Sequence, residues 1–111
     1  MEGPYELTTD MIDKYVTRKS CGNYALGVGS ISSFTVRYVG RSDNDLNARL
    51  KWWVGRSSRY SHFKFSYASS PKEAFEKECR NYHDFDSGKL DNEQHPERPT
   101  GTNWRCPVCG L

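Results

Sequence analysis

Aliphatic side chains are scarce in this chain, and their scarcity limits the size of any hydrophobic core. Leu, Ile, Val and Phe account for 19 of the 111 residues, which is close to the composition of disordered proteins. The small net charge of +2 and the 15 aromatic residues favour a folded domain all the same. A chain of this length has room for one modest core, so residues 1–111 are expected to form a single domain. We expect that something besides apolar packing helps to stabilise it.

The N-terminal segment has none of the features of a secretion signal. Met1-Glu2-Gly3-Pro4 offers neither a basic region nor an apolar run. No apolar stretch approaches the roughly 18 residues that a membrane span requires. We therefore expect an intracellular, cytoplasmic protein that is not secreted and has no membrane partner. In that compartment cysteines bind metal ions more often than they form disulfides.

The C-terminal sequence Cys106-Pro-Val-Cys109-Gly is typical of a zinc knuckle, in which a tight turn directs two thiolates at one metal ion. Cys79 and His83 lie four residues apart in a segment with helical periodicity, so they share one helical face. Together these residues predict a closed Cys₃His site for structural Zn²⁺. Such a site would fasten the C-terminus to the helix and would offset the thin core, since structural zinc contributes roughly 10–16 kcal/mol to folding.

Two other residues are rival ligands for this zinc site. His95 stands before Pro96 in an irregular stretch and could replace His83. Cys21 lies at the start of a predicted strand, where a small buried residue is the more usual occupant. The sequence leaves the choice between His83 and His95 open.

Hydrophobic periodicity and turn residues divide the chain into strands and helices. Thr8, Asp45 and Ser70 each precede a segment of helical spacing and are suited to be N-caps. The predicted helices cover residues 8–19, 46–54 and 71 to about 83, the predicted strands cover 23–28, 34–39 and 62–68, and residues 87–103 are expected to be irregular. This order predicts an α+β domain, with a small three-stranded antiparallel sheet flanked by helices and an irregular C-terminal tail held by zinc.

Positive charge is concentrated in the middle of the chain. Residues 37–64 contain seven Arg and Lys side chains and two acidic ones, whereas residues 65–97 are mainly acidic. A polyanionic partner for the middle segment is one interpretation, and a solvated helix face is the other.

Four short motifs appear in order along the chain. Gly22-Asn23-Tyr24 precedes Tyr38-Val39-Gly40, Arg41 follows the second triplet, Arg49-Leu50 lies in the next predicted helix, and Glu78 lies five residues after Glu73. Over about residues 21–84, with the remaining tail at about 85–111, the sequence resembles the GIY-YIG nuclease family, whose signature strands, Arg helix and metal-binding Glu occur in this order. The histidine that often follows the Arg helix in this family is replaced by Trp52 and Trp53.

This resemblance implies a divalent-metal-dependent endonuclease that hydrolyses phosphodiester bonds in DNA. Tyr24 would be the general base for the attacking water and Tyr38 its partner, and Arg41 and Arg49 would pair with the scissile phosphate. Glu78 would hold one Mg²⁺ or Mn²⁺ ion, which is compatible with a site completed by the substrate. A phenol of pKa about 10 would need its pKa lowered, by Arg49 or by metal-bound water, to act near neutral pH.

Helix geometry separates the residues around Glu78. Glu78 shares a face with Ala74 and is expected to face the sheet, whereas Glu76 is expected to face solvent. Cys79 lies about 100° around the helix from Glu78. We therefore expect the catalytic and the structural metal to occupy different faces of this helix.

Several basic and aromatic residues are suited to contact the nucleic acid. Arg56, Arg59 and Lys64 would bind the DNA backbone without sequence preference. Of Trp52 and Trp53, at least one is expected in the core and the other could stack on bases. His62 could supply an imidazole to the site from the loop before the third strand.

The DNA substrate could be duplex, branched, damaged or single-stranded, and roles in repair, mobile elements or restriction all remain open. The main alternative is a non-catalytic, zinc-containing module that binds nucleic acid. A third possibility is a protein-interaction domain whose basic middle docks an acidic partner.

Overall fold

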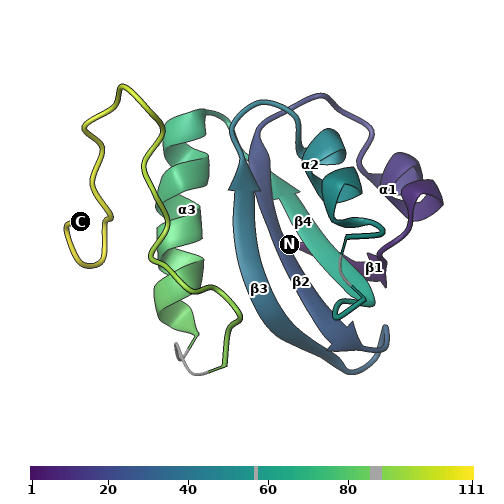
Figure 1. Cartoon of the computed structure of the whole chain (residues 1–111). Coiled ribbons are helices and arrows are strands. Elements are labelled where there is room, and N and C mark those ends of the chain that lie inside the picture. The colour runs from purple at the N-terminus through teal and green to yellow at the C-terminus, as the bar shows by residue number, and fades with distance from the viewer. Residues whose placement is uncertain (57, 86–88) are drawn as a thin grey trace.

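A computed structural model describes residues 1–56, 58–85 and 89–111, and Figure 1 shows the arrangement of its elements. The elements are β1 (Glu2–Glu6), α1 (Thr9–Tyr15), β2 (Gly22–Gly29), β3 (Phe34–Ser42), α2 (Leu46–Trp53), β4 (His62–Tyr67) and α3 (Pro71–Asp84). The strands form one antiparallel sheet in the order β1-β4-β2-β3. Helices α1 and α2 lie on one face of the sheet and α3 on the other, with the C-terminal tail running along α3 (Figure 1). The α+β class is confirmed.

The sheet has four strands, so the expected count of three was wrong. The additional strand is β1, which pairs with β4 through Tyr5 and Phe63 and through Glu6 and His62. Its sequence, EGPYE, contains Gly and Pro and no β-branched residue, so it carries little strand propensity of its own. Strand β1 is held by its pairing with β4 and by the stacking of Tyr5 on Tyr15, whose ring centroids are 3.7 Å apart.

Each helix begins at the expected capping residue. The side chains of Thr8, Asp45 and Ser70 accept hydrogen bonds from the backbone N–H groups of residues three positions later. Helix α1 ends at Tyr15 rather than at residue 19, because Val16 leaves the helical conformation and turns its side chain into the core.

The larger hydrophobic cluster lies between the sheet and the pair α1 and α2. Phe63 and Phe65 point to this face from β4, and Tyr24 and Leu26 point to it from β2. Ile12 and Leu50 cover them from the two helices and are completely buried. Alternation along the strands therefore directs the bulkiest side chains to this face.

The C-terminal tail, which was expected to be irregular, contains no helix or strand in its described residues, but it is bonded to the sheet; residues 86–88 lie outside the described residues. The Asp91 N–H donates to the Arg37 carbonyl at 2.5 Å. The Asn92 side chain donates to the Val39 carbonyl at 2.8 Å and accepts from the Val39 N–H at 3.0 Å. Leu90 adds an apolar contact with Val39. The tail thus covers the edge strand β3.

Within the described residues, no helix combines the length and the apolar character needed to cross a membrane.

Candidate catalytic cleft and metal-binding group

All five residues that the sequence predicts to be catalytic line one cleft of about 330 Å³. The lining comprises Tyr24, Tyr38, Gly40, Arg41, Asp43, Arg49, Glu78, Asn92, Gln94, His95, Pro96 and Glu97. The cleft lies where β3 meets α2 on one side and α3 and the tail on the other. Residues from two strands, two helices and the tail therefore converge on a single space.

The register of β2 and β3 brings the two tyrosines together. Tyr24 is paired with Gly40 and Leu26 with Tyr38, so both tyrosines project from the same face. Their ring centroids are 6.4 Å apart. Gly40 is required for this arrangement, because a Cβ atom at that position would lie 2.4 Å from Cζ and 2.5 Å from the hydroxyl oxygen of Tyr24.

The phenol of Tyr24 is buried and hydrogen-bonded. Trp53 Nε1 donates to the Tyr24 hydroxyl at 2.9 Å. Burial raises the pKa of Tyr24, and the opposing effects of Trp53 and Arg49 do not reverse this. Burial also raises the pKa of Tyr38 to about 12. Both phenols are therefore neutral at pH 7, and the environment does not supply the lowered pKa that a general base would use.

Glu78 faces the cleft from α3 and is paired with Arg41. Arg41 Nη1 donates to Glu78 Oε1 at 2.5 Å, and Arg41 Nε donates to Asp43 at 2.9 Å. Burial raises the pKa of the Glu78 carboxyl, and Arg41 opposes this shift. Glu76 is absent from the cleft lining. Arg41, expected to bind phosphate, thus binds the Glu78 carboxylate in the structure described here.

The two neighbouring tryptophans have different surroundings. Trp53 is partly buried and packs against Tyr38 and Tyr60. Trp52 is 42% exposed, and the guanidinium groups of Arg49 and Arg56 lie 4.8 Å and 4.7 Å from its ring centroid. Trp52 is therefore the one available for stacking.

The other predicted DNA contacts lie outside the cleft lining. Arg56 and Arg59 are exposed on the segment between α2 and β4, where Arg56 also donates to the Trp52 carbonyl at 2.8 Å. Lys64 projects from the α3-facing side of β4 and lines a separate hollow with Ala25 and Val39. His62 pairs with Gly27, three residues along β2 from Tyr24 and toward the other end of that strand.

The tail contributes five cleft residues that the sequence pattern did not predict: Asn92, Gln94, His95, Pro96 and Glu97. They have no periodicity, and they reach the cleft because Asn92 is bonded to Val39. The only sequence signal near them was a histidine that could serve as a zinc ligand.

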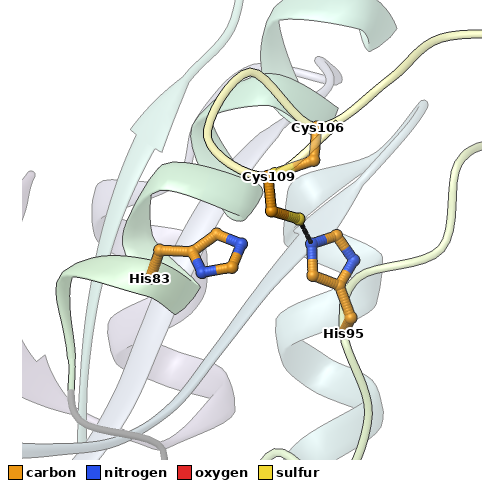
Figure 2. A group of neighbouring side chains, drawn as sticks. All are labelled: His83, His95, Cys106 and Cys109. Carbon is orange, nitrogen blue, oxygen red and sulfur yellow. Dashed lines mark hydrogen bonds between the residues drawn. The ribbon is translucent and has the colours of Figure 1, made fainter. Parts of the chain in front are cut away.

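Two histidines and two cysteines form a group that can hold a metal ion such as zinc. The ligand atoms of His83, His95, Cys106 and Cys109 all lie within 4.8 Å of one another. Figure 2 shows His83 projecting from α3 toward Cys109 and His95 of the tail. Donors bound to tetrahedral zinc are separated by roughly 3.3–3.8 Å, so a small contraction would complete the site.

The hydrogen bonds around the group suit metal binding. His95 Nδ1 lies 2.9 Å from the Pro96 carbonyl, which can only accept, so the proton is on Nδ1 and Nε2 is left to bind the metal. Nε2 lies 3.4 Å from Cys109 Sγ. Burial disfavours the thiolate of Cys106, but hydrogen bonds from the N–H groups of Cys109 and Val108 and from the side chains of His95 and Cys109 together lower the pKa of Cys106 to about 6.

Cys79, which the sequence placed among the ligands, is outside this group, so the predicted ligand set needs correction. Its side chain is fully buried in an apolar cluster with Phe75 and Cys106. Burial raises the pKa of Cys79 to about 12, and the neighbouring Cys106 adds to the shift. Cys79 is therefore a neutral thiol packed against Cys106, and not the thiolate ligand that the sequence predicted. Cys21, the other rival, donates to the Ala68 carbonyl at 3.3 Å.

In comparisons with known proteins, no family model, no curated protein and no solved structure matches the chain.

Proposed function

We propose that this protein is a divalent-metal-dependent endonuclease that hydrolyses phosphodiester bonds in DNA. The observation that carries the proposal is the convergence of Tyr24, Tyr38, Arg41, Arg49 and Glu78 on one cleft. The sequence motifs alone mark these residues as the tyrosine pair, the arginines and the carboxylate of one hydrolytic site. Their meeting in one cleft supports a common role for them.

The carboxylate of Glu78 fits a divalent ion that is completed by substrate. Arg41 engages Oε1, and no hydrogen bond to Oε2 is found among the described residues. Mg²⁺ commonly binds one or two protein carboxylates together with water and phosphate oxygens, and Asp43 is a second carboxylate in the lining. When bound, such an ion neutralises phosphate charge and lowers the pKa of a coordinated water.

The side chains can divide the remaining tasks. Arg49, and Arg41 once it leaves Glu78, donate to the phosphate oxygens and stabilise the charge of the phosphorane. Tyr24 acts in the ionised state of its phenol. As water attacks phosphorus, the phenolate oxygen of Tyr24 accepts a proton from that water. The Trp53 N–H, which donates to that oxygen, stabilises the phenolate. The bond from phosphorus to the leaving oxygen then breaks, and that oxygen takes a proton from solvent water.

A basic and aromatic surface extends from the cleft. Arg49 lines the cleft and stacks on Trp52, whose ring also contacts Arg56. Guanidinium groups bind phosphates, and an exposed indole stacks on bases. This surface supports DNA as the substrate and favours a strand with at least one unpaired base near the scissile bond.

The alternative is a non-catalytic, zinc-containing module that binds nucleic acid at the same cleft. The ion pair between Arg41 and Glu78 favours it, because this pair occupies one carboxylate oxygen. The raised pKa values of both tyrosines favour it as well. Under this alternative the cleft binds a phosphate but breaks no bond.

Nicking of supercoiled plasmid with Mg²⁺ or Mn²⁺ separates the two functions. Wild-type protein is expected to nick, and Glu78→Ala is expected to lose nicking while keeping its affinity for DNA. Arg49→Ala should reduce the rate by about 10²–10³-fold, as expected for loss of one preorganised donor. Glu76→Ala, on the same helix but outside the cleft, is the matched control and should nick normally.

Either of two results would contradict the nuclease proposal. One is a Glu78→Ala variant that nicks at the wild-type rate. The other is folded protein that binds DNA but leaves plasmid, branched and single-stranded substrates intact, which would favour the binding module.

A further inference from the structure

His95 belongs to two sites at once. Its side chain is one of the four that can bind a metal ion, and it also lines the cleft with Tyr24, Arg41 and Glu78. It is close enough to Glu78 to contribute to the electrostatic environment of that carboxylate. Glu78 and His83 project from different faces of α3, about 140° apart around the helix, and His95 of the tail lies in both sites.

The tail segment around His95 is held at both ends. On one side, Asn92 is bonded to Val39 of β3. On the other, Cys106 is buried against α3. Between these anchors, His95 links the segment to α3, because its ring centroid lies 5.5 Å from that of Tyr82 and 5.2 Å from that of His83.

The orientation of His95 directs its free nitrogen away from a catalytic role. Nδ1 donates to the Pro96 carbonyl, and Nε2 faces Cys109 in the metal-binding group (Figure 2). Neither nitrogen is then available to transfer a proton in the cleft. His95 contributes to the cleft as a part of its wall, and the position of this wall depends on what holds Nε2.

We propose that a zinc ion bound by His83, His95, Cys106 and Cys109 positions one wall of the cleft, the segment of residues 92–97. By fixing His95, the metal fixes Gln94, Pro96 and Glu97 beside Arg41 and Glu78. Without the metal, Asn92 still attaches the segment to β3, but residues beyond it leave the cleft. The metal acts as a positioning element for the neighbouring site, and the sheet keeps its structure without it. Hydrogen exchange can test this role without nucleic acid, and only the measurement of oligonucleotide affinity rests on the proposed function.

Amide hydrogen exchange tests the positioning without any nucleic acid. Wild-type protein is compared in its zinc-loaded form and after removal of zinc with a chelator. We expect exchange across residues 92–98 to become faster by about tenfold or more, because a local opening is no longer opposed by metal binding. Exchange across β2 should stay unchanged, which controls for unfolding of the whole domain.

Three outcomes would overturn the inference. The first is protein that binds no zinc. The second is exchange across residues 92–98 that is the same with and without zinc. The third is loss of protection in β2 together with the tail, which would make the metal a requirement of the whole fold rather than of the cleft wall.

Affinity for a fluorescent single-stranded oligonucleotide, measured without a catalytic metal, tests the consequence for binding. His83→Ala removes a metal ligand that is outside the cleft lining, and we expect it to weaken binding by about tenfold. His62→Ala, which alters a histidine remote from both sites, should bind as wild type does. An unchanged affinity in His83→Ala, with wild-type binding present, would overturn the inference. If no form binds nucleic acid while the exchange results hold, the proposed function fails and the positioning role of the metal stands.

Discussion

At the scale of single residues, Tyr24 combines a polar contact with deep burial. Its hydroxyl accepts from Trp53 while its ring crosses Gly40, and burial keeps its pKa above the ordinary value. The fraction of phenolate is therefore small at neutral pH. Any chemistry that uses this phenolate must depend steeply on pH.

The cleavage rate at saturating DNA should rise about tenfold per pH unit from about pH 6 to about pH 9, with no plateau. The sign follows from the raised pKa: below it, each unit of pH multiplies the phenolate population by about ten. Single-turnover rates measured across this range check the prediction, with Tyr24→Phe as the control that lacks the ionising group. A plateau near neutral pH would show that Tyr24 does not act as a phenolate base.

The zinc ligands can be distinguished residue by residue. Loss of a residue that only hydrogen-bonds a metal ligand weakens metal binding by roughly 10–100-fold. His95→Ala should weaken zinc binding by more than this, because it removes a ligand itself. Cys79→Ala should change it by no more than about tenfold, because Cys79 is a buried neutral thiol beside Cys106. Competition with a chromophoric chelator measures both. The reverse order of effects would restore the ligand set that the sequence predicted.

At the scale of elements, the pairing of β2 with β3 decides the geometry of the cleft. Tyr24 lies opposite Gly40, and only a residue without a side chain leaves room for the phenol ring. The Gly of the second triplet therefore has a steric role in placing the Tyr of the first.

Gly40→Ala should lower the free energy of unfolding by about 1–3 kcal/mol through overpacking. In a Tyr24→Leu background, which removes the ring atoms that the new methyl group would meet, the same change should cost less. Urea denaturation of the four proteins of this cycle gives the coupling. Equal costs in both backgrounds would show that Tyr24 is not the residue that requires Gly40.

At the scale of the whole molecule, the basic residues are divided between two faces. Arg56 is exposed near Trp52 and Arg49, on the surface that leads from the cleft. Lys64 lies on the α3-facing side of the sheet, and its ammonium is 5.6 Å from the centroid of the Phe34 ring. The small net charge of +2 hides this distribution.

Salt dependence of DNA binding should report which face contacts the phosphates. Arg56→Ala is expected to reduce the slope of log Kd against log salt concentration by about 1, because one phosphate contact is lost. Lys64→Ala should leave the slope unchanged, and it serves as the matched control. An equal reduction by both substitutions would place the DNA across both faces.

The local sequence was sufficient to predict the three helices and their caps, three of the four strands, and five of the residues that line the cleft. These depend on periodicity, on capping residues such as Ser70, and on motifs in which each residue type has its own chemistry. Tertiary structure alone decided the rest. β1 is a strand because β4 offers it a partner, and Cys79 is not among the grouped ligands because packing buries it against Phe75. His95 reaches both sites because Asn92 fastens the tail to Val39, a contact across 53 residues of sequence that no local pattern contains.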